Sequence, residues 1–264
     1  MGQDRFAVIL PAAGKSSRFG DPKQKKIYTE LDGRAVWLRA VEPFVNRDDV
    51  AQIIMVIAGE DRETFERRYR ASVAFMNIKV IEGGATRTES VARALEFVTP
   101  ECEYIAVHDA ARPCLSHELV EAVFSAARTH GAALPGVRIA DTIKEASDDH
   151  LTSRTVPREH LYLVQTPQVF RRDLLFKAYA NSSRFGGSVT DDCQLVEALG
   201  QQCALVEGSA LNIKITTQID LKLAAAILPL LETPKRPGSS HPYSDAQEMW
   251  SSLPKLKASD LFGA

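Results

Sequence analysis

Short apolar runs alternate with amphipathic stretches along most of the chain. The apolar runs lie at residues 6–10, 52–57, 78–81, 104–107 and 131–137. Runs of this kind are typical of strands that are buried on both faces of a parallel sheet. Stretches with helical spacing lie between or after them, at residues 35–45, 60–70, 88–98, 116–130, 172–180 and 218–231. This alternation predicts an α/β fold with a doubly wound, mostly parallel, Rossmann-like sheet.

Residues 138–165 break this rhythm. Alternating side chains on either side of a polar turn at Ser147–His150 predict a β-hairpin arm that projects from the sheet. An isolated two-stranded hairpin is only marginally stable, so we expect the arm to pack against another surface. After the arm, residues 164–168 return the chain to the sheet, and residues 206–217 predict a late strand.

The composition changes at Thr233, where proline, glycine and serine residues form a linker-like break. We therefore expect one domain over residues 1–232, with the arm at 138–165 as part of it. Residues 233–264 form a C-terminal extension, and no motif within it assigns it a role.

Composition narrows the class of protein. A hydrophobic share of 45% supports a substantial core, and no apolar run approaches the length of a membrane span. A net charge of −2 argues against a general nucleic-acid binder. The four cysteines show no C-x-x-C pair or zinc spacing, and the first residues lack a secretory signal. We expect a cytoplasmic protein with reduced thiols and with neither nucleic acid nor membrane as a partner.

The loop after the first apolar run carries small residues and three cations, Lys15, Arg18 and Lys23. Small side chains let a ligand reach backbone N–H groups, and glycine permits turns that point several N–H groups one way. At the carboxyl end of a strand, such a loop can hold a polyphosphate. The Walker and dinucleotide motifs both fail here, because Asp21 follows Gly20 and serine occupies the second glycine position. A flexible basic surface turn is the alternative.

Candidate functional residues also follow two later strands. The Gly83–Gly84 turn, with Ser90 in the helix that follows, could read the edge of a base, although a strand end and a helix cap at Thr88 would look the same. Asp109 follows another strand, and one carboxylate is enough for a site shared by Mg²⁺ and a nucleotide. Arg112 could orient Asp109, contact phosphate or form a purely structural ion pair with it. His108 is expected to be structural.

Lys214 stands out in the expected late strand, where it shares a face with Asn212. A lysine within an apolar strand is costly to bury unless it meets an anion. An edge-strand lysine that prevents aggregation is the alternative. In the arm, the forked guanidinium of Arg158 suits a phosphate, but arginine is often simply exposed. Thr190 or Asp191 could cap the helix that ends at Gly200.

These motifs resemble one enzyme family. Pro11–Gly14, Arg18, Gly20 and Pro22–Gln24, with the string His108–Pro113, are similar to the 2-C-methyl-D-erythritol 4-phosphate cytidylyltransferases, from about residue 6 to about residue 231. The resemblance implies a nucleotidyltransferase domain that joins CTP and 2-C-methyl-D-erythritol 4-phosphate, giving 4-diphosphocytidyl-2-C-methyl-D-erythritol and pyrophosphate in non-mevalonate isoprenoid biosynthesis. It further implies Mg²⁺ as cofactor and a homodimer clasped by the arm.

The resemblance also implies residue roles. The catalytic cations would be Arg18, Lys23 and Lys214. The nucleotide would be bound by Ala12, Ala13, Gly14, Lys15, Gly84, Ser90, Asp109 and Ala110. The sugar phosphate would be bound by Arg112, Thr142, Arg158, Thr166 and Thr190, and Asp109 would hold the metal. The family often has an acidic residue where this chain has Ala85, so any contact to the base by that side chain is absent or replaced.

Two other functions fit parts of the pattern. A ribitol-5-phosphate cytidylyltransferase shares the chemistry, but those enzymes tend to carry Ala-Gly-Gly in the first loop and a bulkier residue after the first alanine of the second motif. This chain has Ala12–Gly14 and Ala110–Ala111 at those places, which favours the methylerythritol substrate. A non-catalytic nucleotide-sensing protein would bind CTP without releasing pyrophosphate, but the several cations make a neutral sensing pocket the weaker explanation.

Overall fold

The computed structural model describes residues 4–14, 16–20, 25–182 and 189–231. Contacts divide the chain into one unit of residues 1–231 and another of residues 232–264, the latter outside the described residues. The strands of the main sheet are β1 (Phe6–Pro11), β4 (Val50–Ile57), β5 (Ile78–Glu82), β6 (Tyr104–Val107), β7 (Ala132–Arg138), β10 (Tyr162–Val164), β11 (Gln168–Arg171) and β12 (Ala204–Glu207).

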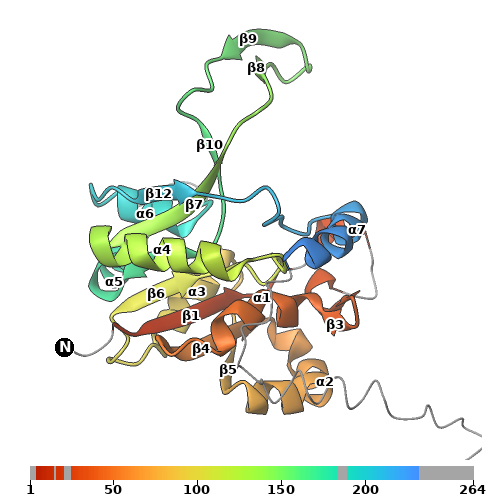
Figure 1. Cartoon of the computed structure of the whole chain (residues 1–264), viewed down its shortest axis with the longest axis vertical. Coiled ribbons are helices and arrows are strands. Elements are labelled where there is room, and N and C mark those ends of the chain that lie inside the picture. Colours follow the sequence, from red (N-terminus) through yellow and green to blue (C-terminus); the bar gives the residue numbers. More distant parts are fainter. Residues whose placement is uncertain (1–3, 15, 21–24, 183–188, 232–264) are drawn as a thin grey trace, which may run out of the picture. The chain divides into compact units, whose positions relative to one another are not determined.

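This main sheet has eight strands in the order β10-β7-β11-β6-β1-β4-β5, and β12 also pairs with β7 (Figure 1). β1 runs parallel to both β4 and β6, and β4 runs parallel to β5. β10 and β11 are antiparallel to their neighbours. The α/β architecture and the mostly parallel sheet are therefore confirmed, with antiparallel pairing where the chain returns from the arm.

Helices cover both faces of the sheet. They are α1 (Val36–Val45), α2 (Arg62–Phe75), α3 (Arg87–Leu95), α4 (His117–His130), α5 (Arg172–Ala180), α6 (Asp192–Glu197) and α7 (Gln218–Ile227). Local signals set their ends. In α4, the Ser116 hydroxyl accepts a hydrogen bond from the Leu119 N–H at 3.2 Å, and Gly131 ends the helix with φ of 80°. Those are the expected N-cap and C-cap residues.

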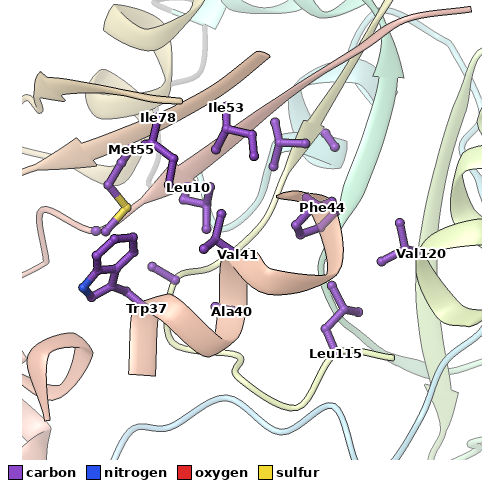
Figure 2. Packing of buried hydrophobic residues seen from close by; sticks show 14 of the residues in the cluster. Leu10, Trp37, Ala40, Val41, Phe44, Ile53, Met55, Ile78, Leu115 and Val120 are labelled. Atoms are coloured by element: carbon purple, nitrogen blue, oxygen red, sulfur yellow. The ribbon is translucent and has the colours of Figure 1, made fainter. Parts of the chain in front are cut away.

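The apolar runs are explained by two hydrophobic layers. In β1, Phe6, Val8 and Leu10 face a cluster built with α1, α2 and α4, while Ala7 and Ile9 face a second cluster built with α3, α5 and α6. Figure 2 shows the first cluster, with Trp37, Val41 and Phe44 of α1 packed toward the sheet. Every residue from Phe6 to Leu10 is buried, which explains why this run is apolar throughout and does not alternate with polar residues.

A third, smaller cluster joins segments that are distant in sequence. Phe19 of the first loop and Ile215 near the end of the domain are both buried in it, together with Ala224 of α7. The cluster fixes the first loop and the Lys214 segment on the same side of the sheet, because one anchor residue comes from each.

The hairpin β8 (Ile143–Ala146) and β9 (Thr152–Val156) forms the projecting arm (Figure 1). A second small ribbon, β2 (Glu30–Leu31) with β3 (Arg34–Ala35), precedes α1. Among the described residues, no helix combines the length and the apolar composition needed to cross a bilayer.

Three sequence-based expectations need correction. The late strand is β12 at residues 204–207, and residues 212–216 are not in a strand. The N-cap of α3 is Thr86, whose hydroxyl accepts from the Glu89 N–H at 3.1 Å, rather than Thr88. The last helix ends at Ile227 and continues only as a 3₁₀ turn. The hydrogen bond from Glu89 to Thr86 decides the start of α3, and the burial of Ile215 in a third hydrophobic cluster accompanies the irregular segment after β12.

Candidate active site

A cleft of about 460 Å³ opens at the carboxyl ends of the parallel strands. The segments that follow β1, β4, β5 and β6 line it, because parallel strands deliver their carboxyl ends to one edge of the sheet. Many residues predicted from the sequence meet in this cleft, namely Ala12, Ala13, Gly14, Gly84, Ser90, Asp109, Ala110 and Lys214.

The first loop is held at its start, at Ala12, and at Phe19. The Ala12 N–H donates to the Val56 carbonyl at 2.8 Å, and Phe19 is buried with an exposed fraction of only 2%. Ser16 adopts φ of 55°, and its hydroxyl accepts from the Lys26 N–H at 3.3 Å. Arg18 lies on a short 3₁₀ turn with its side chain exposed. Lys15 and Lys23 lie outside the described residues.

Lys26 is a cleft residue that the sequence reading missed. Its half-buried side chain lines the cleft, and no ion pair of Lys26 occurs among the described residues. Burial lowers the pKa of its ammonium group, and the charges of Lys214 and Arg18 lower it further. The preceding Lys25 differs, since its Nζ pairs with Asp61 at 2.8 Å and Glu60 at 3.0 Å. Of the two lysines, the one without an ion pair to any described residue is therefore the one that lines the cleft.

Asp109 lies at the centre of a cluster of positive charge. Its carboxylate is 2.7 Å from the Lys214 Nζ, 3.5 Å from Arg87 and 3.8 Å from Arg112. Burial alone would raise the pKa of Asp109, but the charges of Lys214, Arg87 and Arg112 outweigh it and hold the pKa well below its usual range. The carboxylate is thus ionised throughout the physiological range, with Lys214 as its closest partner.

Lys214 occupies this place without being in a strand. After β12 the chain turns, and the Ile215 N–H donates to the Ala111 carbonyl at 2.8 Å. Arg112 donates from Nη1 to the Asn212 carbonyl at 2.7 Å. These two contacts hold an irregular segment against the end of β6, so Lys214 reaches Asp109 with its side chain 39% exposed.

Arg87 is the second cleft residue that the sequence reading missed. It is the first residue of α3, and its guanidinium lies between Asp109 and Asp192, with 2.7 Å to the latter. The helix dipole disfavours a cation at the N-terminus of a helix, where acidic residues are preferred. That unfavourable placement is the signal in the sequence that could have identified Arg87.

The turn after β5 is shaped by side chains of α3. Ser90 accepts from the Gly84 N–H at 3.1 Å and donates to the Thr86 carbonyl at 2.8 Å. A Cβ on Gly83 would lie 2.6 Å from the Ser90 hydroxyl, so this position requires glycine. The Ala85 N–H is taken by the Glu89 carboxylate at 2.8 Å. Hydrogen bonds within the chain preorganise this turn, and Ser90 stabilises it from α3.

A buried histidine supports the end of β6. His108 is fully buried, its Nε2 lies 3.2 Å from the Arg112 carbonyl, and its Nδ1 lies 3.0 Å from the Thr166 hydroxyl. Since a carbonyl only accepts, Nε2 carries the proton and Nδ1 accepts from Thr166. The Thr166 hydroxyl in turn accepts from the Asp109 N–H at 3.0 Å. Burial lowers the pKa of His108 to about 4, so the ring is neutral.

The remaining predicted substrate residues are not brought into the cleft. Thr142 and Arg158 are exposed on the arm, where Arg158 donates to the Ala140 carbonyl. Thr190 is exposed before α6, and its N–H donates to the Gln194 side chain at 2.9 Å. Among the described residues, no group of three acidic, histidine or cysteine side chains could hold a metal ion.

Comparisons with known proteins agree on one family. A family profile described as IspD, 2-C-methyl-D-erythritol 4-phosphate cytidylyltransferase, matches residues 6–229. Proteins of that name from Rhodopirellula baltica and Solibacter usitatus are 39% and 38% identical to the chain; the alignments cover 84% and 85% of this chain, and 94% and 96% of the relatives.

Solved structures of similar proteins have a similar fold. The 4-diphosphocytidyl-2C-methyl-D-erythritol synthase of Anaerococcus prevotii has a TM-score of 0.73 at 30% identity, covering 86% of this chain and 100% of that one. The 2-C-methyl-D-erythritol 4-phosphate cytidylyltransferase of Thermus thermophilus has a TM-score of 0.69 at 36% identity, covering 84% of this chain and 98% of that one.

Proposed function

The chain belongs to the 2-C-methyl-D-erythritol 4-phosphate cytidylyltransferase family, and from this membership we infer that it joins CTP to 2-C-methyl-D-erythritol 4-phosphate. The products are 4-diphosphocytidyl-2-C-methyl-D-erythritol and pyrophosphate, in non-mevalonate isoprenoid biosynthesis. The observation that carries this inference is the convergence of Lys26, Arg87 and Lys214 on one cleft beside the small-residue loop. We place the enzyme in the cytoplasm.

The reaction is a substitution at phosphorus. An oxygen of the acceptor phosphate attacks the α-phosphorus of CTP, a new P–O bond forms, and the bond to the β-phosphate breaks to release pyrophosphate. Both reactants are anions, so the barrier consists largely of positioning and charge repulsion. Fixed cations in a partly buried cleft reduce that repulsion most where charge develops in the transition state.

Two of the cations that line the cleft come from distant segments of the chain. Lys26 belongs to the segment after the first loop, and Lys214 reaches in from the end of the domain. The charge of Arg18 acts on Lys26 as well. We assign the triphosphate and the transition state to these three residues, with Lys15 and Lys23 of the same loop as further predicted contacts.

When CTP binds, its phosphate oxygens have to replace Asp109 as the partner of Lys214. Its ammonium group is 2.7 Å from Asp109 in the free chain. Phosphate oxygens would compete for that ammonium group, while Asp109 keeps Arg87 and Arg112 as neighbours. The base lies, in this proposal, against Ala12, Ala13 and the Gly84 turn, and Ser90 maintains the shape of that turn.

Mg²⁺ fits the cleft only together with a nucleotide. Mg²⁺ takes few protein carboxylates and completes its shell with phosphate oxygens and water, and Asp109 is the buried carboxylate that the cleft offers. When bound, the ion would neutralise the triphosphate and favour departure of pyrophosphate. Asp109 would hold it, in contact with the phosphates rather than with a cage of protein ligands.

The acceptor phosphate requires the arm of a second subunit in this proposal. Thr142 and Arg158 are exposed on the arm rather than in the cleft of their own chain. Large apolar side chains near the arm are exposed too, including Leu163 at 60% and Leu151 at 66%. Exposed apolar surface of this kind marks an interaction site, which supports a homodimer in which each arm completes the partner's cleft. Arg112, Thr166 and Thr190 would complete the acceptor side.

The test measures pyrophosphate release with CTP, UTP, ATP and GTP, each paired with 2-C-methyl-D-erythritol 4-phosphate or ribitol 5-phosphate. We expect release only with CTP and the methylerythritol substrate, lost with a chelator and restored by Mg²⁺. Faster release with ribitol 5-phosphate would replace the proposed acceptor. Tight binding of CTP without release, with every acceptor, would identify a nucleotide sensor instead.

A further inference from the structure

Asp192 is a buried carboxylate beside the cleft that the proposed reaction does not use. It is the first residue of α6 and has an exposed fraction of 0%, so it cannot touch a ligand itself. One of its oxygens accepts from the Tyr179 hydroxyl, and the other accepts from Arg87 Nη2 at 2.7 Å. A charge buried this deeply is costly unless it is paired, and Arg87 is the cation that pairs it.

The backbone of Asp192 is fixed as firmly as its side chain. The Gln168 side-chain carbonyl accepts from the Asp192 N–H at 3.1 Å and from the Cys193 N–H at 3.0 Å. The same Gln168 donates to Asp191 at 2.9 Å. These bonds attach the start of α6 to β11, so the carboxylate occupies a set position relative to the sheet.

Arg87 needs such an anchor because its own helix does not favour it. It opens α3, where the helix dipole repels a cation. Burial also opposes its charge, but Asp192 and Asp109 together raise the pKa of Arg87, so the guanidinium stays charged in the cleft wall. The bond to Asp192 is shorter than the 3.5 Å contact to Asp109, so Asp192 is the main restraint.

We propose that Asp192 is a positioning residue, which holds the Arg87 guanidinium in the cleft wall beside Asp109 and keeps it from closing onto that carboxylate. The proposal rests on the proposed function for the reaction that Arg87 serves. In Asp192→Asn the guanidinium would have only Asp109 as an anionic partner. Misplacing one group in such a site can cost up to a hundredfold in rate, and we expect kcat/KM to fall by about tenfold or more.

A double-mutant cycle separates positioning from general damage to the fold. Asp192→Asn, Arg87→Met and the double variant are compared by kcat/KM. If Asp192 acts through Arg87, Asp192→Asn changes kcat/KM by less than about twofold in the Arg87→Met background. Equal losses in both backgrounds, or unchanged kcat/KM in the single variant, overturn the proposal. Glu197→Gln removes an exposed carboxylate from the same helix and should leave kcat/KM unchanged.

A second readout does not need turnover. The guanidinium NMR signals of Arg87, identified by their absence in Arg87→Met, should show restricted rotation in the parent chain and lose it in Asp192→Asn. Unchanged signals refute the positioning role even if the enzyme is active. Restricted signals in a chain that turns over no substrate refute the proposed reaction alone.

If Asp192→Asn does not fold, Tyr179→Phe replaces it. We expect Tyr179→Phe to lower kcat/KM by about fivefold, and this effect must also vanish in the Arg87→Met background.

Discussion

Two consecutive lysines show how neighbouring residues of one type take different roles. Lys25 pairs with Asp61 and Glu60, whereas Lys26 lines the cleft near Lys214 and Arg18. Both have the same charge and almost the same place in the sequence. What differs is the direction of the two side chains at the start of the short 3₁₀ turn that begins at Lys26: one ammonium group reaches the turn Gly59–Asp61 before α2, and the other lines the cleft.

We predict that Lys26→Met lowers kcat about a hundredfold, because loss of one donor to developing charge costs on the order of 3 kcal/mol. Lys214→Met should have an effect of the same size. The unfolding temperature of Lys26→Met should not fall, since burial and nearby cations already disfavour the Lys26 charge. Lys25→Met is the matched control, with kcat unchanged and only a lower unfolding temperature. Normal turnover in Lys26→Met would remove that lysine from the mechanism.

The lowered pKa of His108 predicts that the stability of the fold depends on pH. Its pKa is about 4 in the folded chain against 6.5 for an ordinary histidine, so the unfolded chain binds the proton first as the pH falls. The stability contributed by the neutral ring is complete above pH 6.5 and is lost as the pH drops to 4. With about 1.4 kcal/mol per pKa unit, the free energy of unfolding should fall by about 3 kcal/mol more in the parent chain than in His108→Gln. Urea unfolding from pH 7 to pH 4 measures it, and parallel curves would contradict it.

At the scale of elements, the arm has no evident role within a single chain. β8 and β9 pair only with each other among the described strands, and residues of the arm carry the predicted acceptor contacts Thr142 and Arg158. A hairpin held by its own pairing is marginal in water, so a partner surface would stabilise it.

A mixing experiment tests whether two subunits share each cleft. Lys214→Met and Arg158→Ala are each expected to be inactive as homodimers. In mixed dimers, one of the two clefts combines an intact Lys214 with an intact arm, so random mixing should restore about a quarter of parent activity. Mixing Lys214→Met with Lys26→Met is the control, because both changes are in the same cleft and no recovery is expected. A fully active monomer in sedimentation analysis would refute the shared cleft.

The elements themselves were largely predictable. Apolar runs gave β1, β4, β5 and β6, since a strand covered on both faces needs no polar position, and helix α5 was predicted with the observed bounds. The failure at residues 206–217 has a definite cause. Ile213 and Ile215 look like alternate positions of a strand, but Ile215 is buried against Phe19 and α7 in a third cluster, which period-two patterning cannot reveal.

At the scale of the whole molecule, the described part of residues 1–231 contains both hydrophobic layers and the described residues that line the cleft. The family match ends at residue 229. We therefore propose that residues 1–232 suffice as the nucleotidyltransferase domain. A chain ending at residue 232 should keep its unfolding temperature within about 2 °C and its kcat within about twofold, because stability changes of a few tenths of a kcal/mol shift the midpoint by only that much. Aggregation, or a kcat below a tenth of the parent value, would show that residues 233–264 belong to the working enzyme.

By itself, the sequence determined the fold class, the small-residue loop and the acidic strand end at Asp109, because each depends on residues that are neighbours in the chain. The tertiary structure alone decided which charges meet. Arg87 and Asp192 are 105 positions apart, yet their side chains lie within 2.7 Å. Coulomb energy depends on separation in space, and the packing that brings α3, α6 and the Lys214 segment to one sheet edge leaves no local pattern to read.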